Sequence, residues 1–232
     1  MNKQQSGRAT MGNRASASNQ ALTAPGGSED RHGVRAGKRP AGNFRKPGAF
    51  RKLWPTEHDK LRNHLLRLDR ESRRLRFAHS VTDAFIDDYA ARMNDMGGLV
   101  HGYFENGELH AVAELRKLGL GWGSEAEVAF SVEAAYQNLG IGSELMGRVI
   151  RSARNRGISH LYMSCLAENS RIQHIAKKHK ADIKIEYGDV VGDILPKAPD
   201  YFSMISEALE DRVGYMMAVL DLGQRQLQQR DQ

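Results

Sequence analysis

The middle of the chain reads Gln137-Asn138-Leu139-Gly140-Ile141-Gly142-Ser143, between a segment typical of a strand and one typical of a helix. Two glycines separated by one residue allow the backbone to turn tightly and to approach a ligand closely. The helix that follows directs unpaired N–H groups and the positive end of its dipole out of the same turn. This stretch therefore predicts a binding site for an anion.

Two familiar phosphate-binding loops do not fit the stretch. A dinucleotide-binding loop has the pattern G-x-G-x-x-G after a parallel strand, and Leu145 occupies the position of its third glycine. A P-loop has Lys directly after its last glycine, whereas Ser143 follows Gly142 here. The loop is thus expected in another type of fold.

The segments before the loop predict antiparallel strands. Residues 125–132 alternate in polarity, as a strand with one buried face does. The side chains on its apolar face are Ala126, Val128, Phe130 and Val132. Residues 99–105 and 108–118 read as two further strands joined by Asn106-Gly107, the dipeptide that best tolerates the positive φ of a two-residue hairpin turn.

The remaining segments complete an α+β layout, in which hairpins come first and a strand–helix–strand crossover follows. Helices are expected over 57–68 with Thr56 as N-cap, 70–77, 83–93 with Thr82 as N-cap, 140–156 and 170–179, and short strands over 49–54, 160–165, 183–187 and 190–195. A last helix over 199–222 carries an apolar stripe that either covers the domain or joins a second copy of the chain. The stripe consists of Ile205, Leu209, Val213, Met216 and Leu220. The order predicts a mixed, mostly antiparallel central sheet flanked by helices, with an extra C-terminal helix.

The segment from Gln137 to Gly142 resembles the Q/R-x-x-G-x-G/A pyrophosphate motif of the GCN5-related N-acetyltransferases, the GNAT family. The resemblance extends in the expected order from Leu53 to about Leu195, and includes Ala126-Glu127-Val128, the strand of Cys165 and Glu168-Asn169. It implies a GNAT acyltransferase domain over residues 49–197. A basic N-terminal tail over 1–48 is predicted to be disordered, and residues 198–232 form a C-terminal amphipathic helix and polar tail.

The same resemblance implies acetyl-CoA as co-substrate. Its pantetheine is expected to lie like an extra strand between residues 125–132 and 160–165, and its pyrophosphate at the glycine-bearing loop. The residues expected to bind it are Phe130, Val132, Gln137, Asn138, Leu139, Gly140, Ile141, Gly142, Ser143 and Asn169.

Amide formation from a thioester requires an uncharged amine, and a lysine-like amine is mostly protonated at neutral pH. Glu127 is the candidate general base, because members of the resembled family often carry a glutamate at this place on the strand; Glu125 is the reserve candidate. The alternative is that Glu127 faces solvent or an arginine. The family's proton-donating tyrosine would fall on Ala176, so no general acid is assigned. Nearby alternatives are Tyr136, Ser170, His174 and His179, or a thiolate that leaves unassisted.

Other reactive side chains carry less information. The single cysteine, Cys165, is more typical of a buried core residue than of a nucleophile. No H-E-x-x-H or C-x-x-C motif is present, so no metal is expected. The arginine cluster Arg70, Arg73, Arg74 and Arg76 is interpreted as a solvated helix face, with contact to the acceptor or to the 3′-phosphate of coenzyme A as the alternative.

The positive charge lies in the first quarter of the chain. Residues 1–52 contain 11 Lys or Arg and two acidic residues. Residues 53–232 contain 23 Lys or Arg and 26 acidic residues. A basic arm of this kind is suited to nucleic acid, an anionic membrane or an acidic partner, but a solvated extension is the favoured interpretation. No run of about 18 apolar residues is present, so we expect no membrane association and a cytoplasmic protein.

Two functions stay open from the sequence. The first is an N-acyltransferase that acts on a primary amine of a protein lysine or of a small molecule. The second is a non-catalytic acyl-CoA-binding regulatory module whose basic tail contacts nucleic acid or an acidic partner. In either case the C-terminal helix offers a surface for a homodimer.

Overall fold

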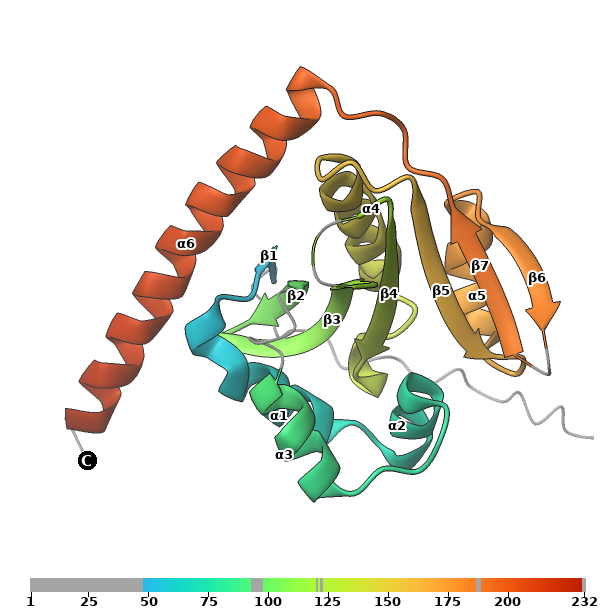
Figure 1. The fold of residues 1–232 in the computed structure, drawn as a ribbon. Coiled ribbons are helices and arrows are strands. Elements are labelled where there is room, and N and C mark those ends of the chain that lie inside the picture. Colours follow the sequence, from blue (N-terminus) through green and yellow to red (C-terminus); the bar gives the residue numbers. More distant parts are fainter. Residues whose placement is uncertain (1–47, 93–97, 120, 122, 187–188, 231–232) are drawn as a thin grey trace, which may run out of the picture. The chain divides into compact units, whose positions relative to one another are not determined.

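The structure, a computed structural model, describes residues 48–92, 98–119, 121, 123–186 and 189–230 (Figure 1). The predictions for the basic tail therefore lie almost entirely outside the described residues. Its strands are β1 (Ala49–Lys52), β2 (Leu99–Glu105), β3 (Glu108–Lys117), β4 (Glu125–Val132), β5 (His160–Leu166), β6 (Asp182–Glu186) and β7 (Asp189–Ile194). Its α-helices are α1 (His58–Arg67), α2 (Arg70–Phe77), α3 (Asp83–Arg92), α4 (Ile141–Arg154), α5 (Ser170–Lys178) and α6 (Tyr201–Arg230).

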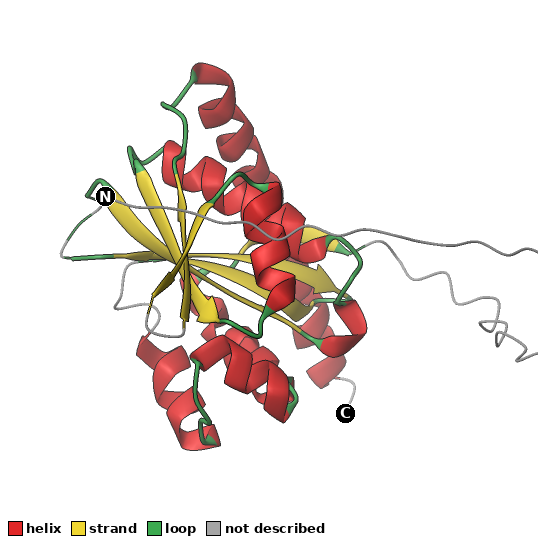
Figure 2. Ribbon diagram, turned by 90° about the vertical axis from the view of Figure 1, so that its right-hand side faces the viewer, coloured by secondary structure: helices red, strands yellow, loops and turns green. Residues whose placement is uncertain are grey.

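The strands form one sheet in the order β1-β2-β3-β4-β5-β7-β6. Neighbouring strands are antiparallel except β4 and β5, which run parallel because α4 crosses over between them. Helices lie on both faces of the sheet (Figure 2). The predicted mixed, mostly antiparallel sheet with flanking helices and an extra C-terminal helix is confirmed.

The β2–β3 hairpin forms as the sequence predicts. Asn106 and Gly107 both adopt positive φ, 53° and 77°, which a two-residue turn of the right twist requires. Residues of β3 divide between two cores, and a register shift against β2 interrupts their alternation between Leu109 and Ala111. Ala111, Ala113 and Leu115 pack with α4, while Leu109 and Val112 pack with α1 and α3.

The crossover from β4 to β5 positions the functional site. Parallel pairing joins only Glu125, Ala126 and Glu127 of β4 to residues 160–162 of β5. Beyond Glu127, β4 still pairs with β3 and β5 still pairs with β7 on its other edge, but β4 and β5 no longer pair with each other. The two strands therefore separate towards their C-terminal ends, next to the loop that precedes α4.

One predicted helix start is wrong. Thr56 does not cap α1, because residues Pro55–Glu57 form a short 3-10 turn and α1 begins at His58. The Glu57 carboxylate explains the shift, since it accepts hydrogen bonds from the Trp54 N–H at 3.2 Å and from Arg51 at 2.7 Å. The Thr82 cap is confirmed, with its hydroxyl accepting from the Phe85 N–H at 3.2 Å.

The C-terminal helix α6 presents its apolar stripe to solvent. Its polar face lies against β1 and α4, where Glu207 accepts from Lys52 at 2.6 Å and Glu210 accepts from Arg148 at 2.9 Å. On the opposite face Phe202 is 82% exposed and Leu220 is 65% exposed. The helix thus covers the domain through charged side chains, and of the two alternatives predicted for its stripe, burial against the domain is the one that does not hold.

The helix α6 also extends eight residues past the predicted end at Leu222, to Arg230. The added segment contains no proline and consists mainly of long unbranched residues that favour helices. Among the described residues, none of the helices combines the length and the hydrophobicity that a bilayer crossing requires.

Candidate functional site

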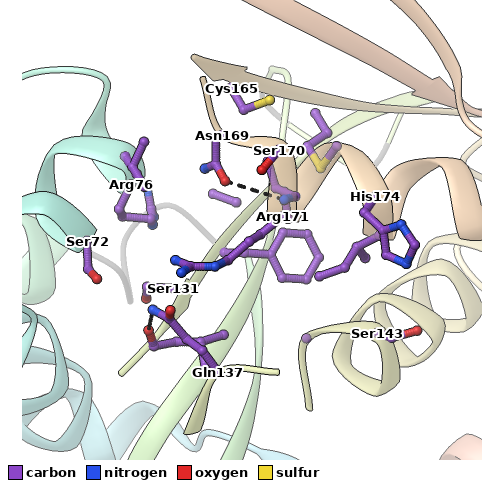
Figure 3. A pocket seen from close by; sticks show the side chains of 18 of the residues that line it. Ser72, Arg76, Ser131, Gln137, Ser143, Cys165, Asn169, Ser170, Arg171 and His174 are labelled. Atoms are coloured by element: carbon purple, nitrogen blue, oxygen red, sulfur yellow. Dashed lines mark hydrogen bonds between the residues drawn. The ribbon is translucent and has the colours of Figure 1, made fainter. Parts of the chain in front are cut away.

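A cavity of about 720 Å³ opens where β4 and β5 separate. It is bounded by α2, by β4 and β5, by the loop before α4 and by the start of α5 (Figure 3). Eight of the predicted binding residues line it, namely Phe130, Val132, Gln137, Asn138, Gly140, Gly142, Ser143 and Asn169. Leu139 and Ile141 do not, because the Leu139 side chain points to solvent and Ile141 is part of the core.

The loop before α4 owes its shape to two residues with positive φ. Gly140, the N-cap of α4, has a φ of 81°, and Asn138 has a φ of 60°. Asparagine tolerates positive φ better than most other residues with a side chain do. The sequence analysis did not predict this conformation for Asn138. A side chain at Gly140 would meet nothing within 4 Å, so its conformation and not a lack of space requires glycine there.

The first turn of α4 faces the cavity with its N–H groups. The first bond inside the helix runs from the Glu144 N–H to the Gly140 carbonyl oxygen at 3.1 Å. The N–H groups of Ile141, Gly142 and Ser143 therefore have no partner within α4. Arg171 and Lys178 of α5 line the same cavity and add positive charge, and Arg171 extends into it (Figure 3). These features suit an anionic ligand.

The free edge of β4 forms a second wall. The Glu133 N–H donates to the His110 carbonyl oxygen on the β3 side at 3.0 Å. Main-chain groups of successive residues point to opposite sides of a strand, so those of Phe130 and Val132 point away from β3, towards the gap. An extended ligand in the cavity can thus pair with the Phe130 groups and the Val132 N–H as an added strand would, while the Val132 carbonyl oxygen already accepts from the Gln137 side-chain amide at 3.0 Å.

Asn169 lies at the start of α5, where its side-chain oxygen accepts from the Ile172 N–H at 3.4 Å. It therefore caps α5 and lines the cavity at once (Figure 3). Cys165 is buried in the core cluster and also reaches the cavity wall.

Glu127 does not line the cavity. Its carboxylate lies 3.6 Å from Arg116, and about a third of the side chain is exposed, 33%. Glu125, the reserve candidate, accepts a hydrogen bond from the Tyr162 hydroxyl at 3.1 Å. The geometry thus favours the arginine-facing alternative for Glu127.

Three of the four candidates for a general acid, Tyr136, Ser170 and His174, line the cavity. The Tyr136 hydroxyl already donates to Glu105 at 2.6 Å, whereas Ser170 and His174 lie on α5 (Figure 3). His179 does not line the cavity and lies 3.2 Å from the Ser143 hydroxyl. Ala176, at the position of the family's tyrosine, is fully buried.

Two arginines of α2 form hydrogen bonds inside the protein. The prediction that the arginine cluster is a solvated helix face is therefore wrong for Arg73 and Arg76. Arg73 donates to the main-chain oxygens of Leu66 and Leu68 at 2.5 and 3.1 Å. Arg76 donates to the buried Glu114 at 2.6 Å and lines the cavity. Because Glu114 lies on β3, 38 residues after Arg76, no local pattern in the sequence pointed to this pair.

A second polar group behind β4 was also missed. Ser131, which lines the cavity, lies 2.9 Å from Nε2 of His64, and Nδ1 of His64 lies 3.0 Å from Glu133. Burial lowers the pKa of His64. Burial alone raises the pKa of Glu133, but hydrogen bonds from His64 and His110 and the charge of Arg67 bring it down to about 2. His64 is 67 residues from Ser131 and 69 residues from Glu133 in the sequence, so only the fold brings the three side chains together.

Among the described residues, no group of three or more His, Cys, Asp or Glu side chains is placed to hold a metal ion.

A sequence model of the acetyltransferase (GNAT) family matches residues 60–180, which include β4, the glycine-bearing loop, α4 and α5. The chain belongs to the GNAT family. No curated protein matches this GNAT chain significantly.

Solved structures share the GNAT fold with this chain. The GNAT domain of S. lividans PAT has 21% identity and a TM-score of 0.56, over 64% of this chain and 90% of its own. A putative acetyltransferase from Acinetobacter baylyi ADP1 has 14% identity and a TM-score of 0.54, over 66% and 94%. A GNAT-family acetyltransferase from Streptococcus pneumoniae has 18% identity and a TM-score of 0.51, over 64% and 99%. At these identities the likeness concerns the fold.

Proposed function

We propose that this GNAT protein transfers an acyl group, with acetyl as the expected donor, from coenzyme A to a primary amine. The observation that carries the proposal is one cavity bounded by the free edge of β4 and by the N-terminus of α4. The first suits an extended, amide-bearing arm and the second suits a pyrophosphate. Acyl-CoA has both groups, because its pantetheine arm carries two amides and its pyrophosphate is attached to the end of that arm away from the thioester.

The binding part of the proposal assigns the ten residues predicted from the sequence. Main-chain groups of Phe130 and Val132 hold the pantetheine, and the segment from Gln137 to Ser143 surrounds the pyrophosphate. For Leu139 and Ile141 only the main chain takes part, because their side chains lie outside the cavity. Asn169 contacts the pantetheine or phosphate arm from α5.

The chemical part requires a group that removes a proton from the amine before or during attack on the thioester carbonyl. Glu127 is the sequence-derived candidate for this step. In that role it requires the acceptor amine to displace Arg116, the cation that lies 3.6 Å from its carboxylate. A Glu127→Gln variant tests the role, since it keeps the shape of the side chain and removes the charge.

Two glycines at opposite ends of α4 provide a matched test of binding. Gly140 and Gly157 both have positive φ, 81° and 73°, and both have open space around the missing side chain. Gly140→Asp adds strain and a negative charge at the proposed phosphate site, whereas Gly157→Asp adds the same strain far from it. We expect calorimetry to show acetyl-CoA binding that only Gly140→Asp abolishes. No binding by the folded wild-type protein would overturn the proposal.

A thiol-release assay with a panel of primary amines then tests transfer. Release of coenzyme A that depends on the amine supports an N-acyltransferase. Binding of acetyl-CoA with no turnover on any amine supports the non-catalytic regulatory module, a function that the absence of the family's tyrosine at Ala176 favours.

A further inference from the structure

Ser131 lines the cavity and is linked by hydrogen bonds to two further polar side chains, His64 and Glu133. Its hydroxyl lies 2.9 Å from Nε2 of His64, whose Nδ1 lies 3.0 Å from Oε1 of Glu133. His64 is completely buried and is not among the residues that line the cavity. Ser131 is thus the one member of this group that a ligand can touch.

The neighbours of His64 decide where its proton lies. Glu133 also accepts from Arg67 at 3.0 Å and from His110 at 2.9 Å, so its carboxylate stays ionised and can only accept. Nδ1 of His64 therefore donates to Glu133, and Nε2 is left as the acceptor for the Ser131 hydroxyl. The other charged group that faces His64 is Glu114 of β3. The arrangement directs the Ser131 hydrogen towards His64 and leaves its oxygen lone pairs for the cavity.

We infer that Ser131, in place of Glu127, is the catalytic residue that takes the proton of the acceptor amine, because Ser131 lines the cavity and Glu127 does not, with His64 and Glu133 as positioning residues. The inference rests on the proposed function. As the amine nitrogen attacks the thioester carbon, its proton moves to Oγ of Ser131 while the hydroxyl proton moves to Nε2 of His64. The C–S bond then breaks, and coenzyme A leaves as a thiolate. The proton held by His64 returns through Ser131 to the thiolate, so that the enzyme is restored.

The same three side chains resemble a system in which serine itself attacks the carbonyl. In such a system the histidine must also protonate the leaving group and therefore must reach it. His64 has no exposed surface and contacts the cavity only through Ser131. The geometry therefore favours proton transfer over an acyl-serine intermediate.

A second serine in the same protein provides the matched control. Ser152 is fully buried and lies 2.9 Å from Nε2 of His101 and 2.8 Å from Glu207, but it does not line the cavity. Ser131→Ala and Ser152→Ala each remove one hydroxyl from a histidine–carboxylate cluster. The assay uses acetyl-CoA with spermidine, tyramine and Nα-acetyl-lysine, and calorimetry measures the affinity for coenzyme A.

We expect Ser131→Ala to bind coenzyme A as the wild type does and to lose about 100-fold in kcat, the contribution of a positioned general base. Ser152→Ala is expected to keep its kcat. In both proteins kcat/KM should rise tenfold per pH unit up to the pKa of the amine, because the uncharged amine is the nucleophile, so the loss in Ser131→Ala should be a lower kcat at every pH with unchanged affinity for coenzyme A. Ser131→Thr keeps the hydroxyl and should restore most of the rate, which a purely structural role would not require.

Glu133→Gln is a second variant that leaves Ser131 in place. The amide can donate to Nδ1 of His64 and so favours the tautomer that cannot accept from Ser131, and kcat should fall towards that of Ser131→Ala while the affinity for coenzyme A stays unchanged. Where no amine of the panel reacts, the hydrolysis of acetyl-CoA should show the same order of variants. A wild-type rate for Ser131→Ala, or an acetyl group found on Ser131 by mass spectrometry, would overturn the inference. Failure of the wild type to bind coenzyme A would instead overturn the proposed function.

The exposed face of α6 supports an independent proposal. Phe202, Ile205, Leu209, Val213, Met216 and Leu220 recur at intervals of three or four residues and are 39–82% exposed. The exposed aromatic side chains Tyr201 and Phe202 alone leave about 300 Å² uncovered if each has about 200 Å² of surface. Monomeric proteins rarely leave a contiguous apolar patch of more than a few hundred Å² in water.

Charge on α6 argues against a membrane as the partner. Interfacial helices carry Lys and Arg beside their apolar face. From Tyr201 to Leu222, α6 has one basic residue, Arg212, against the acidic residues Glu207, Glu210, Asp211 and Asp221. The polar face is already paired with the cations of β1 and α4, so the apolar face alone is left for a partner.

We propose that α6 pairs with α6 of a second copy of this chain. An antiparallel pair centred on residue 211 places Phe202 opposite Leu220 of the second copy and Leu209 opposite its Val213, so the face is complementary to itself, as a twofold interface must be. With the aliphatic side chains added to the aromatic ones, each helix offers an area close to the roughly 800 Å² per partner of a stable interface.

Sedimentation equilibrium of the full chain tests this pairing. We expect a dimer at micromolar concentration, and a monomer with an unchanged circular dichroism spectrum for Leu209→Asp combined with Leu220→Asp. Leu195→Asp, at an apolar residue after β7 that is 66% exposed, is the control and should remain dimeric. A wild type that stays monomeric to about 100 µM, well above the affinity of standard-size interfaces, would overturn the proposal. So would binding of the wild type to vesicles of phosphatidylglycerol that the double variant loses.

Discussion

Gln137 closes the connection between β4 and the glycine-bearing loop by donating its side-chain amide to the Val132 carbonyl oxygen at 3.0 Å. This bond spans five residues and fixes the end of the free β4 edge relative to the N-terminus of α4. A glutamine at the start of the motif thus has an architectural reason to be there, since it aligns the two walls of the cavity.

We expect Gln137→Ala to weaken coenzyme A binding about fivefold, because one net hydrogen bond of about 1 kcal/mol no longer holds the loop. Gln173 is a matched control, since its amide donates to the Ala167 carbonyl oxygen at 2.8 Å but the residue does not line the cavity. Calorimetry with coenzyme A should show an unchanged affinity for Gln173→Ala. Equal losses in both variants would contradict the architectural role.

The attachment of α6 depends on Glu207. Its carboxylate accepts from Lys52, Ser152, Asn155 and Arg156 at 2.6–2.9 Å and is 7% exposed. Glu207→Ala leaves these donors without their acceptor and should lower the free energy of unfolding by about 3 kcal/mol. Glu210→Ala, which removes a half-exposed partner of Arg148 and Arg151, should cost less than about 1 kcal/mol. Urea denaturation measures both, and the reverse order would be inconsistent with this account.

Acid should destabilise the protein in two separate steps. Burial, together with the charge of Lys52, lowers the pKa of His101 from 6.5 to about 3. The unfolded chain therefore takes up this proton first, and stability falls as pH drops below 6.5. Burial alone raises the pKa of Glu207, but hydrogen bonds from Lys52 and Asn155 lower it from 4.5 to about 2. Its contribution is fully present above pH 4.5 and is lost as pH falls through 2.

Variants at these two positions separate the steps. His101→Gln should flatten the dependence of the unfolding free energy on pH between about 6.5 and 4.5, where each such group contributes up to about 1.4 kcal/mol per pH unit. Glu207→Gln should flatten it below pH 4.5 and leave the upper range unchanged. Denaturation midpoints measured from pH 8 to pH 3 check both. An unchanged slope above pH 4.5 in His101→Gln would show that other groups dominate.

Much of the site could be predicted because its main features are local in sequence. The Asn106-Gly107 turn, the alternation of residues 125–132 and the glycines at 140 and 142 each encode their own geometry, and together they give the sheet, the free edge and the loop. What could not be predicted depends on contacts between distant segments. The His64–Ser131 and Arg76–Glu114 pairs join a helix to a strand, and nothing near either residue in the sequence specifies the partner.

Which face of α6 lies against the domain could not be predicted either, because it also depends on distant segments. The sequence gives a helix with an apolar stripe, and burial of that stripe is the usual outcome. Here the cations of β1 and α4, including Lys52 and Arg148, form a surface that only the acidic face of α6 can satisfy. Helix and stripe follow from periodicity, whereas the choice of face depends on charges elsewhere in the chain.

Gly142 offers a test that separates binding from stability. A Cβ added there would lie 2.9 Å from Cδ1 of Ile175, a side chain that lines the cavity from α5. In Gly142→Ala the flexible end of Ile175 can move away, and alanine favours the helix by up to about 1 kcal/mol, so the stability should not fall. The displaced methyl group should instead narrow the cavity and weaken coenzyme A binding by about tenfold, equivalent to about 1.4 kcal/mol. Ile175→Val shortens that side chain by the same methyl group, so the double variant should recover most of the affinity. If the double variant binds more weakly than Gly142→Ala alone, the glycine acts through the backbone and not through its contact with α5.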